Sequence, residues 1–389
     1  MRRKICVVTS SRADYGLLRP LIFAIKNEAT LELQIVATGT HLSPEHGLTY
    51  REIENDRLTI SRKIDIPTNC ASPVGAAKAI GLGVIGFADA LCDLSPDLLI
   101  VLGDRYEIFS AVSAALIANI PVGHIHGGEV TEGAFDEALR HSITKMSHLH
   151  FVAADSYRKR VIQLGEQPQN VHLVGSLGIE NIRSLKLLSR EELEKSLGFG
   201  FGPRNLLITF HPATLSFESA VAQTRELLTA LGALKNTVLI FTMPNADPES
   251  QDIARLLKDF AINHANAHVF TSLGHLRYLS CMAHVDGVIG NSSSGIIEAP
   301  SFGIGTVNIG DRQRGRLQAK SIINCAPLKK EILSAIDRLY QPDFRQQISS
   351  NLNPYLSDDT SKKILKVIMD RSLTDLHKKT FFDALDGIT

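Results

Sequence analysis

Short runs of β-branched and aliphatic residues alternate along this chain with longer stretches in which apolar positions recur every three or four residues. The short runs predict buried strands, and the longer periodicity predicts amphipathic helices. Because parallel strands need crossover connections that are usually helical, this alternation predicts a parallel sheet with helices on both faces. In the first half we expect strands at 4–9, 32–38, 97–102, 120–125, 150–153 and 171–174, and helices at 17–28, 73–94, 105–118, 136–146 and 155–164.

The alternation weakens between residues 185 and 203, where a charged stretch gives way to three glycines and a proline. Such a segment is typical of a domain boundary. The chain has 389 residues, which is long for one core. We therefore predict an α/β fold with two doubly wound, Rossmann-like domains that face a cleft, at 1–185 and 186–389, the second closed by charged C-terminal helices. Its expected strands are 205–209, 237–242, 268–271 and 285–289, and its expected helices are 219–234, 249–262 and 275–283.

The charge balance and the cysteine pattern narrow the class of protein. Forty-one basic and 41 acidic residues cancel, so we expect no nucleic-acid partner. No run approaches the ~18 uncharged apolar residues of a membrane span, and the apolar run after the basic start is too short for a signal sequence. The odd cysteine count, without a CxxC pair, indicates buried, reduced thiols in a cytoplasmic protein; the five are Cys6, Cys70, Cys92, Cys281 and Cys325.

Ligands of doubly wound sheets bind beyond the carboxyl ends of the strands, so polar clusters at those points are candidate sites. The strand at 4–9 runs into a loop with Arg12 and Asp14, ahead of the helix expected from residue 17. The backbone N–H groups of such a turn and the Arg12 guanidinium would suit a phosphate. In the alternative, Asp14 caps the helix and Arg12 lies in solvent. The spacing supports both equally.

The strand at 97–102 is followed by Asp104, Arg105 and Glu107. Asp104 can cap a helix that begins at Arg105, with Glu107 completing a capping box, and spacing alone favours this alternative. In the functional alternative, Asp104 is a carboxylate at the end of the sheet that serves as an acid or a base.

The strand at 120–125 runs into a loop with more titratable side chains than a turn needs, which favours a functional site. Gly127 and Gly128 permit a tight turn or a close ligand approach. Two histidines two residues apart share one face of a strand, but without an HExxH or His–Cys grouping we expect no metal site. The titratable residues are His124, His126, Glu129, Asp136, which would also cap the next helix, and Glu137.

The segment 81–86 matches the dinucleotide-binding pattern GxGxxG. It lies inside the helix expected at 73–94 and not at a strand-to-helix turn, where the phosphate-binding mechanism requires it. We therefore interpret its glycines as small residues for close helix packing.

Several segments of the second half carry candidate ligand groups. His211 follows the strand at 205–209, and Asn245 and Asp247 follow the strand at 237–242. After the strand at 285–289, a Ser-rich run opens a helix with Glu298 one turn in. Its hydroxyl groups favour a pyrophosphate site, although an N-cap would need only one serine. The residues of this run are Ser292, Ser293, Ser294 and Gly295.

A loop at 308–316 holds three arginines, among them Arg312, and two glycines, Gly310 and Gly315. This composition suits an anion. The alternative is a solvated charge run, which is common on protein surfaces.

Taken in order, these segments resemble the hydrolysing UDP-N-acetylglucosamine 2-epimerases that begin sialic acid synthesis, and the similar epimerases of legionaminic acid synthesis. Each motif alone is weak, but the ordered set is specific and covers most of the chain. The matching stretches are SSRADYG (10–16), GDRYE (103–107), HIHGGE (124–129), FDEALRH (135–141), FHP (210–212), PNAD (244–247), GNSSSG (290–295) with Glu298, and GDRQ (310–313).

The resemblance implies a GT-B-like architecture, with UDP held mainly by the C-terminal domain and the sugar by the N-terminal domain. It implies that UDP leaves by elimination across C1–C2 to give a glycal, which water converts to free N-acetylmannosamine. It implies no cofactor and no metal, and a homodimer or homotetramer. The alternative substrate is UDP-2,4-diacetamido-2,4,6-trideoxyglucose of the legionaminic acid pathway, which differs at C4 and C6.

Under this resemblance, acid–base groups should flank the sugar, because the C2 proton is removed on one face and replaced on the other. Candidates are Asp104, Glu129 and Asp136, with His126 standing where related epimerases often carry glutamate. His211 would join the serines and Arg312 in stabilising the departing diphosphate. The expected substrate-binding residues are Arg12, Asp14, Arg105, Asn245, Asp247, Ser292, Ser293, Ser294, Gly295, Glu298 and Arg312.

Two further functions fit a GT-B scaffold. A glycosyltransferase would use the same diphosphate site but would need an acceptor pocket, and the carboxylates expected on the sugar side favour elimination instead. A non-catalytic UDP-sugar binding protein would not need the titratable loop at 124–137.

Overall fold

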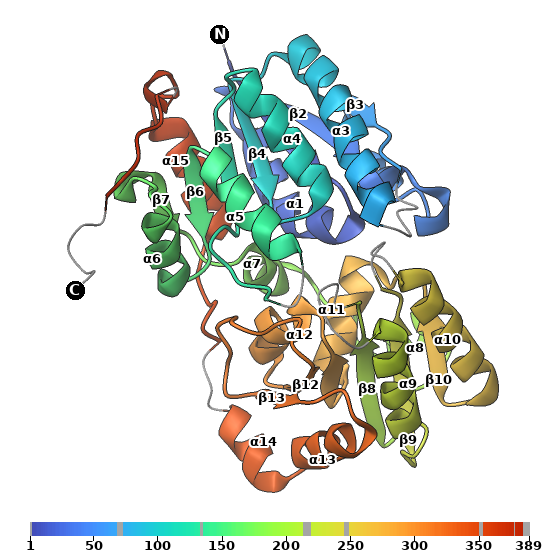
Figure 1. The fold of residues 1–389 in the computed structure, drawn as a ribbon. Helices are drawn as coiled ribbons and strands as arrows, with labels where there is room; N and C mark the ends of the chain where they lie inside the picture. Colours follow the sequence, from blue (N-terminus) through green and yellow to red (C-terminus); the bar gives the residue numbers. More distant parts are fainter. Residues whose placement is uncertain are drawn as a thin grey trace. The chain divides into compact units, whose positions relative to one another are not determined.

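The computed structural model describes residues 2–67, 73–132, 135–212, 219–244, 249–349, 353–376 and 378–383. The chain forms two compact units (Figure 1). Unit 1 consists of Met1–Glu129, Asp136–Asn181 and Ser357–Thr389, and unit 2 consists of Val130–Phe135 and Ile182–Leu356. The chain therefore leaves unit 1 twice and returns to it twice.

Unit 1 holds the strands β1 (Arg3–Thr9), β2 (Leu31–Thr38), β3 (Arg62–Ile64), β4 (Leu98–Leu102), β5 (Val122–Ile125), β6 (Leu149–Val152) and β7 (Val171–Leu173). Its helices include α1 (Arg12–Asn27), α2 (Tyr50–Asn55), α3 (Pro73–Leu94), α4 (Tyr106–Ile117), α5 (Asp136–Met146), α6 (Asp155–Gln163), α7 (Leu177–Ser184) and α15 (Thr360–Asp370). The strands pair in parallel in the order β3-β2-β1-β4-β5-β6-β7.

Alternate residues of the central strand β1 enter two separate cores of unit 1. Ile5 and Val7 pack in one core with residues of α1 and α15. Cys6 and Val8 pack in the other with residues of α3 and α4. Burial on both faces explains why the strands of this unit are almost continuously apolar.

Unit 2 holds β8 (Arg204–Thr209), β9 (Thr237–Thr242), β10 (Ala267–Phe270), β11 (Gly287–Gly290), β12 (Gly305–Ile309) and β13 (Ile322–Cys325). Its helices include α8 (Arg190–Leu197), α9 (Ala220–Leu231), α10 (Ser250–Asn263), α11 (Gly274–His284), α12 (Ser293–Ile297), α13 (Lys329–Leu339) and α14 (Pro342–Ser349). The strands pair in parallel in the order β10-β9-β8-β11-β12-β13. Leu206 and Ile208 of β8 face α9 and α13, and Leu207 faces α8 and α11.

The predicted fold class is therefore confirmed: two α/β units, each with a parallel sheet between helices. Three strands were not expected. Two of the three residues of β3 are charged, and Thr306 and Asn308 interrupt the apolar run of β12. The strand β13 is short and only half-buried, so it lacks the apolar signal of a central strand.

Helix α1 begins at Arg12, five residues before the expected start. Ser11 is its N-cap, and its side chain accepts a hydrogen bond from the backbone of Asp14 while the Asp14 side chain binds the Ser11 backbone. This reciprocal capping box satisfies two backbone donors that would otherwise lack partners. Asp14 thus sits three residues inside the helix and is not the cap itself.

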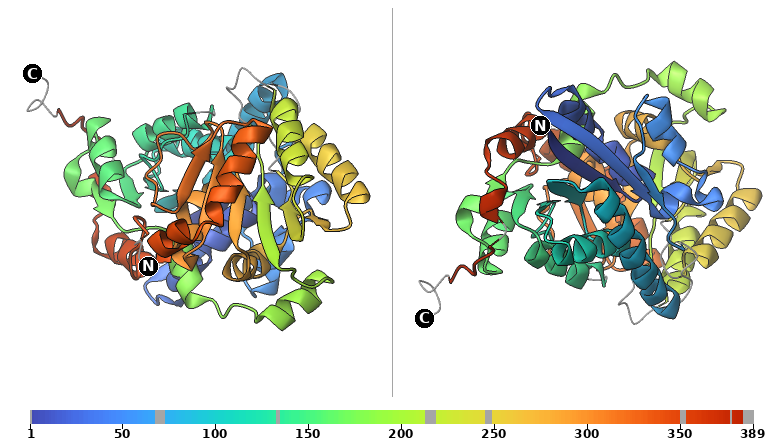
Figure 2. Two further views of the ribbon diagram at one scale, coloured as in Figure 1. Left: turned by 90° about the horizontal axis from the view of Figure 1, so that it is seen from below. Right: turned by 90° about the horizontal axis from the view of Figure 1, so that it is seen from above.

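The C-terminal segment belongs to unit 1, whereas the sequence placed it in a second domain that ran from residue 186 to the end. The reason is apolar burial: Ile364 and Ile368 of α15 enter the same core as α1. The Arg3 guanidinium also donates to the carbonyl of Ile368, and the red C-terminal helix lies beside the start of the chain in Figure 2. The chain first crosses into unit 2 after Glu129, and its second crossing, after Asn181, lies close to the expected boundary at 185.

Helix α3 contains the GxGxxG segment. All three glycines were predicted to serve close packing, and two of them, Gly83 and Gly86, do. A Cβ at Gly83 would lie 2.7 Å from the Ser110 hydroxyl, and one at Gly86 would lie 2.6 Å from Ile64. Val74–Leu94 is long and apolar enough to cross a membrane by length and composition alone. However, Phe87 and Leu91 are buried in a core of unit 1, so α3 has one side built into the fold.

The cysteines differ in part from the expectation of buried thiols. Cys6 and Cys281 are buried, and Cys325 is half-buried, but Cys92 on α3 is exposed. Cys70 lies outside the described residues.

Candidate functional site

The loops that follow β1, β4 and β5 lie side by side, because these three strands are neighbours in the parallel sheet of unit 1. Parallel strands all end at the same edge, so this order brings together motifs that are far apart in the sequence. The candidate residues Arg12, Asp104 and His126 each follow one of these strands.

Asp104 does not cap the following helix. Helix α4 begins at Tyr106, and its N-cap, Arg105, makes no side-chain capping hydrogen bond. The Asp104 carboxylate instead accepts a hydrogen bond from the guanidinium of Arg140 on α5. The predicted capping box is therefore wrong, because the Asp104 carboxylate forms an ion pair with the buried Arg140 and makes no capping hydrogen bond to α4.

Arg140 connects the polar residues at this edge of the sheet. Its side chain is 2% exposed, and its second nitrogen donates to the carbonyl of His126 at 3.3 Å. The same nitrogen lies 3.9 Å from a carboxylate oxygen of Glu129. One buried guanidinium thus gathers Asp104, His126 and Glu129 into a single cluster.

His126 and Glu129 form a close, buried pair. Nδ1 of His126 lies 2.7 Å from Oε1 of Glu129, and the side chains are 8% and 1% exposed. Nε2 of His126 is buried and has no hydrogen-bond partner among the residues that the structure describes. His126 also has a φ of +66°, which is rare for a residue with a side chain and is commonly found at functional sites.

His124 has a structural role in this part of the unit. Its ring nitrogens lie 2.8 Å from the carbonyl oxygen of Gly103 and 3.1 Å from the hydroxyl of Thr144. Burial lowers the pKa of His124 to about 3, so the ring is neutral at physiological pH. It therefore ties β5 and α5 to the residue that precedes Asp104. Gly128 is required nearby, because a Cβ there would lie 2.6 Å from the Tyr157 carbonyl oxygen.

In the loop after β1, the side chains of Asp14 and Arg12 already bind other groups of the protein. The Asp14 carboxylate accepts hydrogen bonds from the backbone N–H groups of Ser10, Ser11 and Tyr15 at 2.7–2.8 Å, and from nearby hydroxyl groups. The Nε of Arg12 pairs with Glu52 of α2 at 3.3 Å, so Arg12 is not simply in solvent.

A second buried carboxylate lies next to these residues. Glu107 is completely buried on α4, 3.2 Å from the Nε of Arg105. Burial raises the pKa of Glu107, although the charge of Arg105 opposes the shift. Arg105 is thus paired with Glu107. Two further candidates lie on α5: Asp136 is its first residue, and Glu137 pairs with His141 at 2.9 Å.

In unit 2, the loops after β8, β11 and β12 are likewise neighbours, and Asn291 organises them. The buried Asn291 side chain accepts from the backbone N–H of His211 at 2.7 Å and donates to the His211 carbonyl at 2.8 Å. The Asn291 carbonyl accepts from Arg312 at 3.2 Å and from Gln313 at 2.8 Å. Asn291 therefore brings His211 and Arg312 to one end of the sheet.

The serine run begins α12 directly after β11. Ser292 is the N-cap, and its hydroxyl accepts a weak hydrogen bond from the Ser294 backbone at 3.4 Å. Tyr278 of α11 lies within hydrogen-bonding reach of Ser292 and Ser294, and Glu298 is close enough for its charge to oppose ionisation of the phenol. Burial, with a smaller contribution from Glu298, raises the pKa of Tyr278 to about 12, so the phenol is a proton donor at physiological pH.

The arginine loop after β12 is only partly a solvated charge run. Arg314 is 67% exposed and lies 3.6 Å from Glu132. Arg316, by contrast, is half-buried and donates to the carbonyl of Val130 at 3.0 Å. The segment Val130–Phe135, which directly follows Glu129, is thereby joined to unit 2.

The structure thus brings Asp104, His126 and Glu129 together in unit 1, and His211, Ser292–Ser294 and Arg312 to one edge in unit 2. Asn245 and Asp247 lie outside the described residues. Sequence reasoning missed Arg140, Asn291, Gln313 and Tyr278. The only available signal was that Arg140, Asn291 and Gln313 stand inside or next to the quoted motifs.

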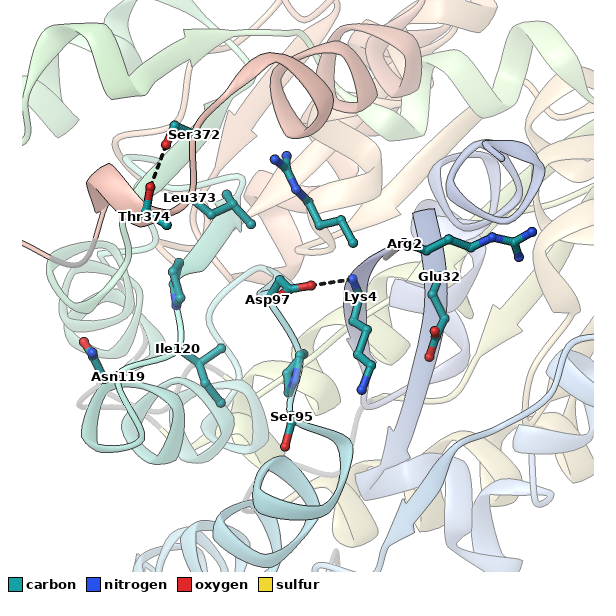
Figure 3. A pocket seen from close by; sticks show the side chains of 13 residues that line it. Arg2, Lys4, Glu32, Ser95, Asp97, Asn119, Ile120, Ser372, Leu373 and Thr374 are labelled. Atoms are coloured by element: carbon teal, nitrogen blue, oxygen red, sulfur yellow. Dashed lines mark hydrogen bonds between the residues drawn. The ribbon is translucent and has the colours of Figure 1, made fainter. Parts of the chain in front are cut away.

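Two other observations bear on the site. Within the described ranges, no group of three or more histidine, cysteine, aspartate or glutamate side chains is arranged to hold a metal ion. A depression of about 970 Å³ in unit 1 lies at the amino ends of the strands, with Lys4, Asp97 and Ser372 in its lining (Figure 3). It contains none of the candidate residues, and the Lys4 backbone there is hydrogen-bonded to Asp97 at 2.8 Å.

Two α/β units, each with a parallel sheet and with polar clusters beyond the carboxyl ends of its strands, define a GT-B-like fold. The chain belongs to the UDP-N-acetylglucosamine 2-epimerase family, whose model matches residues 23–369. It is an enzyme of the hydrolysing type within that family.

Two curated relatives and one solved structure are similar over nearly the whole chain. The GDP/UDP-N,N'-diacetylbacillosamine 2-epimerase (hydrolyzing) of Campylobacter jejuni is 41% identical and covers 98% of this chain and 99% of its own length. Polysialic acid biosynthesis protein P7 of Escherichia coli is 40% identical over 95% of this chain and 94% of its own. The crystal structure of a putative UDP-N-acetylglucosamine 2-epimerase from Listeria monocytogenes superposes with a TM-score of 0.78 at 17% identity, covering 99% and 100%.

Proposed function

We propose that this enzyme converts a UDP-linked 2-acetamido sugar and water into UDP and the free sugar with the opposite configuration at C2. A base removes the C2 proton while the C1–oxygen bond to the diphosphate breaks, which leaves a C1=C2 double bond. Water then adds its oxygen at C1, and a proton returns to C2 on the opposite face. UDP and the 2-epimer are the only products, so no redox cofactor is needed.

The observation that carries this proposal is the cluster of Asp104, His126 and Glu129 around Arg140. Elimination followed by hydration needs at least two acid–base groups near C2. The Glu129 carboxylate beside Nδ1 orients the imidazole of His126 and leaves Nε2 for proton transfer. Asp104, held from α5 by Arg140, supplies a second group of a different chemical type. Asp136 begins the same helix and remains a third candidate.

Unit 2 supplies the proposed diphosphate site. His211, Ser292–Ser294 and Arg312 meet at one end of its sheet through Asn291. Hydroxyl groups and a guanidinium there would stabilise the negative charge that develops on UDP as it leaves. In this proposal Glu298 and Asn245 bind the nucleoside, and Arg12 and Arg105 bind the substrate from unit 1. That the two units face each other across a cleft stays a prediction.

The test is proton NMR of the purified protein with a UDP-sugar in D2O, with EDTA and without any sugar acceptor. We expect UDP and a free sugar of opposite C2 configuration, carrying deuterium at C2. A product that stays linked to UDP, or that retains protium at C2, would contradict the proposal. Turnover only after an acceptor is added would favour a glycosyltransferase, and tight binding without UDP release would favour a binding protein.

For the substrate, we propose UDP-2,4-diacetamido-2,4,6-trideoxyglucose ahead of UDP-N-acetylglucosamine. The support is the name of the Campylobacter relative and its match over nearly the full length of both chains. The name of the Escherichia coli relative, at 40% identity, instead points to sialic acid chemistry and therefore to UDP-N-acetylglucosamine. Comparing kcat/KM for the two sugars in the same assay decides between them, and a higher value for UDP-N-acetylglucosamine would overturn this order.

A further inference from the structure

The loop after β5 carries His126 and Glu129, and the chain passes from unit 1 into unit 2 directly after Glu129. On the unit 1 side, two helices hold the backbone of this loop. Arg140 of α5 donates to the carbonyl of His126 at 3.3 Å. Arg160 of α6 donates to the carbonyl of Gly128. Because hydrogen bonds from a charged donor are stronger than neutral ones, this half of the loop is held firmly to unit 1.

On the unit 2 side, a third arginine binds the next alternate carbonyl. The Nε of Arg316, in the loop after β12, donates to the Val130 carbonyl at 3.0 Å. Its Nη2 lies 3.4 Å from the hydroxyl of Thr131. Val130 and Thr131 are 6% and 3% exposed, so the contact is made to a buried stretch. A planar guanidinium can reach both acceptors at once, whereas an ammonium group is a single point charge.

The residue before Arg316 allows the two backbone segments to approach. Gly315 has a φ of +82°, and a Cβ there would lie 2.8 Å from Oε1 of Glu132 and closer still to the side chain of Val130. Both the backbone conformation and the lack of space therefore require glycine at this position. The loop after β12 is shaped to lie against the stretch that begins at Val130.

The same loop carries Arg312, the proposed diphosphate ligand. Arg312 and the fully buried Gln313 donate to the carbonyl of Asn291 at 3.2 Å and 2.8 Å. The backbone N–H of Arg316 donates to the Gln313 carbonyl at 3.3 Å, so the residues between them form a turn. Because the segment is short and internally bonded, the position of Arg316 depends on the position of Arg312.

We propose that Arg316 is a positioning residue for the acid–base loop. A diphosphate held at Arg312 orders the turn that carries Arg316, and Arg316 holds the backbone at Val130, one residue after Glu129. In this role Arg316 touches no reacting atom. It acts through Glu129, whose carboxylate lies beside Nδ1 of His126. The role rests on the proposed function, which supplies both the diphosphate site and the acid–base pair.

Amide hydrogen exchange with and without UDP tests the coupling and needs no turnover. In the wild-type chain, UDP should slow exchange both at 290–295 and at 128–132. In Arg316→Ala, UDP should still protect 290–295, but the protection of 128–132 should be lost. Protection of 290–295 alone in the wild type, or of both segments in Arg316→Ala, would show that Arg316 does not couple them.

The exchange data also separate this inference from the proposed function. If UDP protects neither segment of the wild-type chain, the proposed diphosphate site is wrong and the role of Arg316 fails with it. If UDP protects 290–295 but not 128–132, the diphosphate site stands and only the role of Arg316 is overturned.

Kinetics should show a loss of turnover without a loss of binding. Arg316→Ala should lower kcat about 10–100-fold, because a small displacement of an acid–base group is costly, while the Kd for UDP stays close to wild type. Arg316→Lys keeps the charge and should show the same split at smaller size, which serves if Arg316→Ala folds poorly. A parallel loss of UDP affinity and kcat in both variants would indicate a structural role alone.

The matched control is Arg314→Ala, which removes the same charge from the same loop. Arg314 is 67% exposed and lies 3.6 Å from Glu132, so water screens its ion pair. We expect kcat and the Kd for UDP to stay at wild-type values. If Arg314→Ala loses as much kcat as Arg316→Ala, the charge of the loop matters and the contact of Arg316 with Val130 does not.

A double-mutant cycle tests whether Arg316 acts through Glu129. Arg316→Ala should lower kcat much less in a Glu129→Gln chain than in the wild type, because the group that Arg316 positions is already disabled. The measurement is kcat of the two single variants and the double variant under saturating UDP-sugar. If the two losses multiply in full, Arg316 acts independently of Glu129 and the positioning role is wrong.

Discussion

At the scale of single residues, the environment decides chemistry that spacing leaves open. The spacing of Asp104 and Glu107 matches a capping box, and the sequence cannot show that Arg140, 36 positions away, will take the Asp104 carboxylate instead. A buried guanidinium must find acceptors, because an unpaired buried charge is strongly destabilising. Its acceptors come from the loops after β4 and β5, which only the strand order brings together. The three candidates of the cluster were foreseeable; the arginine that joins them was not.

This arrangement predicts that Asp104 serves catalysis more than folding. Asp104→Asn should keep UDP affinity close to wild type and lower kcat about 10²–10⁴-fold, the usual cost of losing a positioned acid or base, while the loss of the charge that faces the buried Arg140 lowers the thermal unfolding midpoint without preventing folding. The measurements are UDP release, calorimetric titration with UDP, and thermal unfolding. Asp155→Asn is the control, because Asp155 is an exposed partner of Lys159 on α6. Parallel loss of UDP binding and turnover would show that Asp104 serves the nucleotide or the fold.

The close pair of His126 and Glu129 predicts a different effect. Glu129→Gln keeps the size of the side chain but removes the carboxylate charge that lies beside Nδ1 of His126. We expect kcat to fall with little change in KM, whereas His126→Gln, which removes the imidazole itself, should lower kcat further; steady-state kinetics of the two variants checks this. An unchanged kcat in Glu129→Gln would mean that Glu129 only supports the loop.

At the scale of elements, apolar periodicity predicted most strands of both sheets; it failed at β12, where Thr306 and Asn308 interrupt a buried run, and at strands whose burial is partial. The strands β3 and β13 lie at sheet edges, and the structure gives them one buried face at most, so their sequences lack a continuous apolar run. The start of α1 was missed for another reason, because the capping box of Ser11 and Asp14 was available in the sequence but the apolar pattern begins later. The placement of polar clusters at strand ends was predictable because topology fixes it, whereas the partners of each side chain depend on several elements.

The serine run tests the proposed diphosphate site at this scale. Replacing Ser292, Ser293 and Ser294 together with alanine should weaken UDP binding several-fold or more, because hydrogen bonds to charged groups contribute about 1.5–3 kcal/mol each. Loss of the Ser292 N-cap should cost about 1 kcal/mol of stability as well, so unfolding is measured in parallel. Ser372→Ala is the control, because Ser372 lies in unit 1, in the depression at the amino ends of its strands. Unchanged UDP affinity by calorimetry would move the diphosphate site elsewhere.

At the scale of the whole molecule, the chain's last helix returns to the first unit, which neither composition nor local pattern indicates. After α15, residues 378–383 stay on unit 1: Phe382 N–H donates to the Gly165 carbonyl at 2.9 Å, and Gln167 donates to Thr380 at 2.9 Å. The anchor is Lys379, whose ammonium lies 2.7 Å from the buried Glu166. Contacts between segments more than 200 positions apart cannot be read from the sequence, because they depend on the packed sheet beneath them.

Glu166 should make stability depend on pH in a defined window. Burial alone would raise its pKa, but the hydrogen bond and charge of His150 and the charge of Lys379 outweigh burial and lower the pKa to about 2, from an ordinary 4.5. A carboxyl group whose folded pKa is depressed stabilises the fold fully above its unfolded pKa and loses that contribution as pH falls through the folded value. The affected window therefore runs from about 4.5 down to about 2. At ~1.4 kcal/mol per pKa unit, the difference between 4.5 and about 2 corresponds to a loss of about 3.5 kcal/mol.

Denaturant unfolding at a series of pH values checks this prediction. The wild-type chain should lose stability steeply between pH 4.5 and 2, whereas Glu166→Gln should be less stable at pH 7 and should show a shallower decline across that window. Glu137→Gln is the matched control, because Glu137 also pairs with a histidine but its side chain is 25% exposed, against 2% for Glu166. The buried pair should govern the slope, since water screens the exposed one. If the slope of Glu166→Gln equals that of the wild type, other carboxylates set the acid sensitivity and Glu166 does not hold the C-terminal segment in place through its charge.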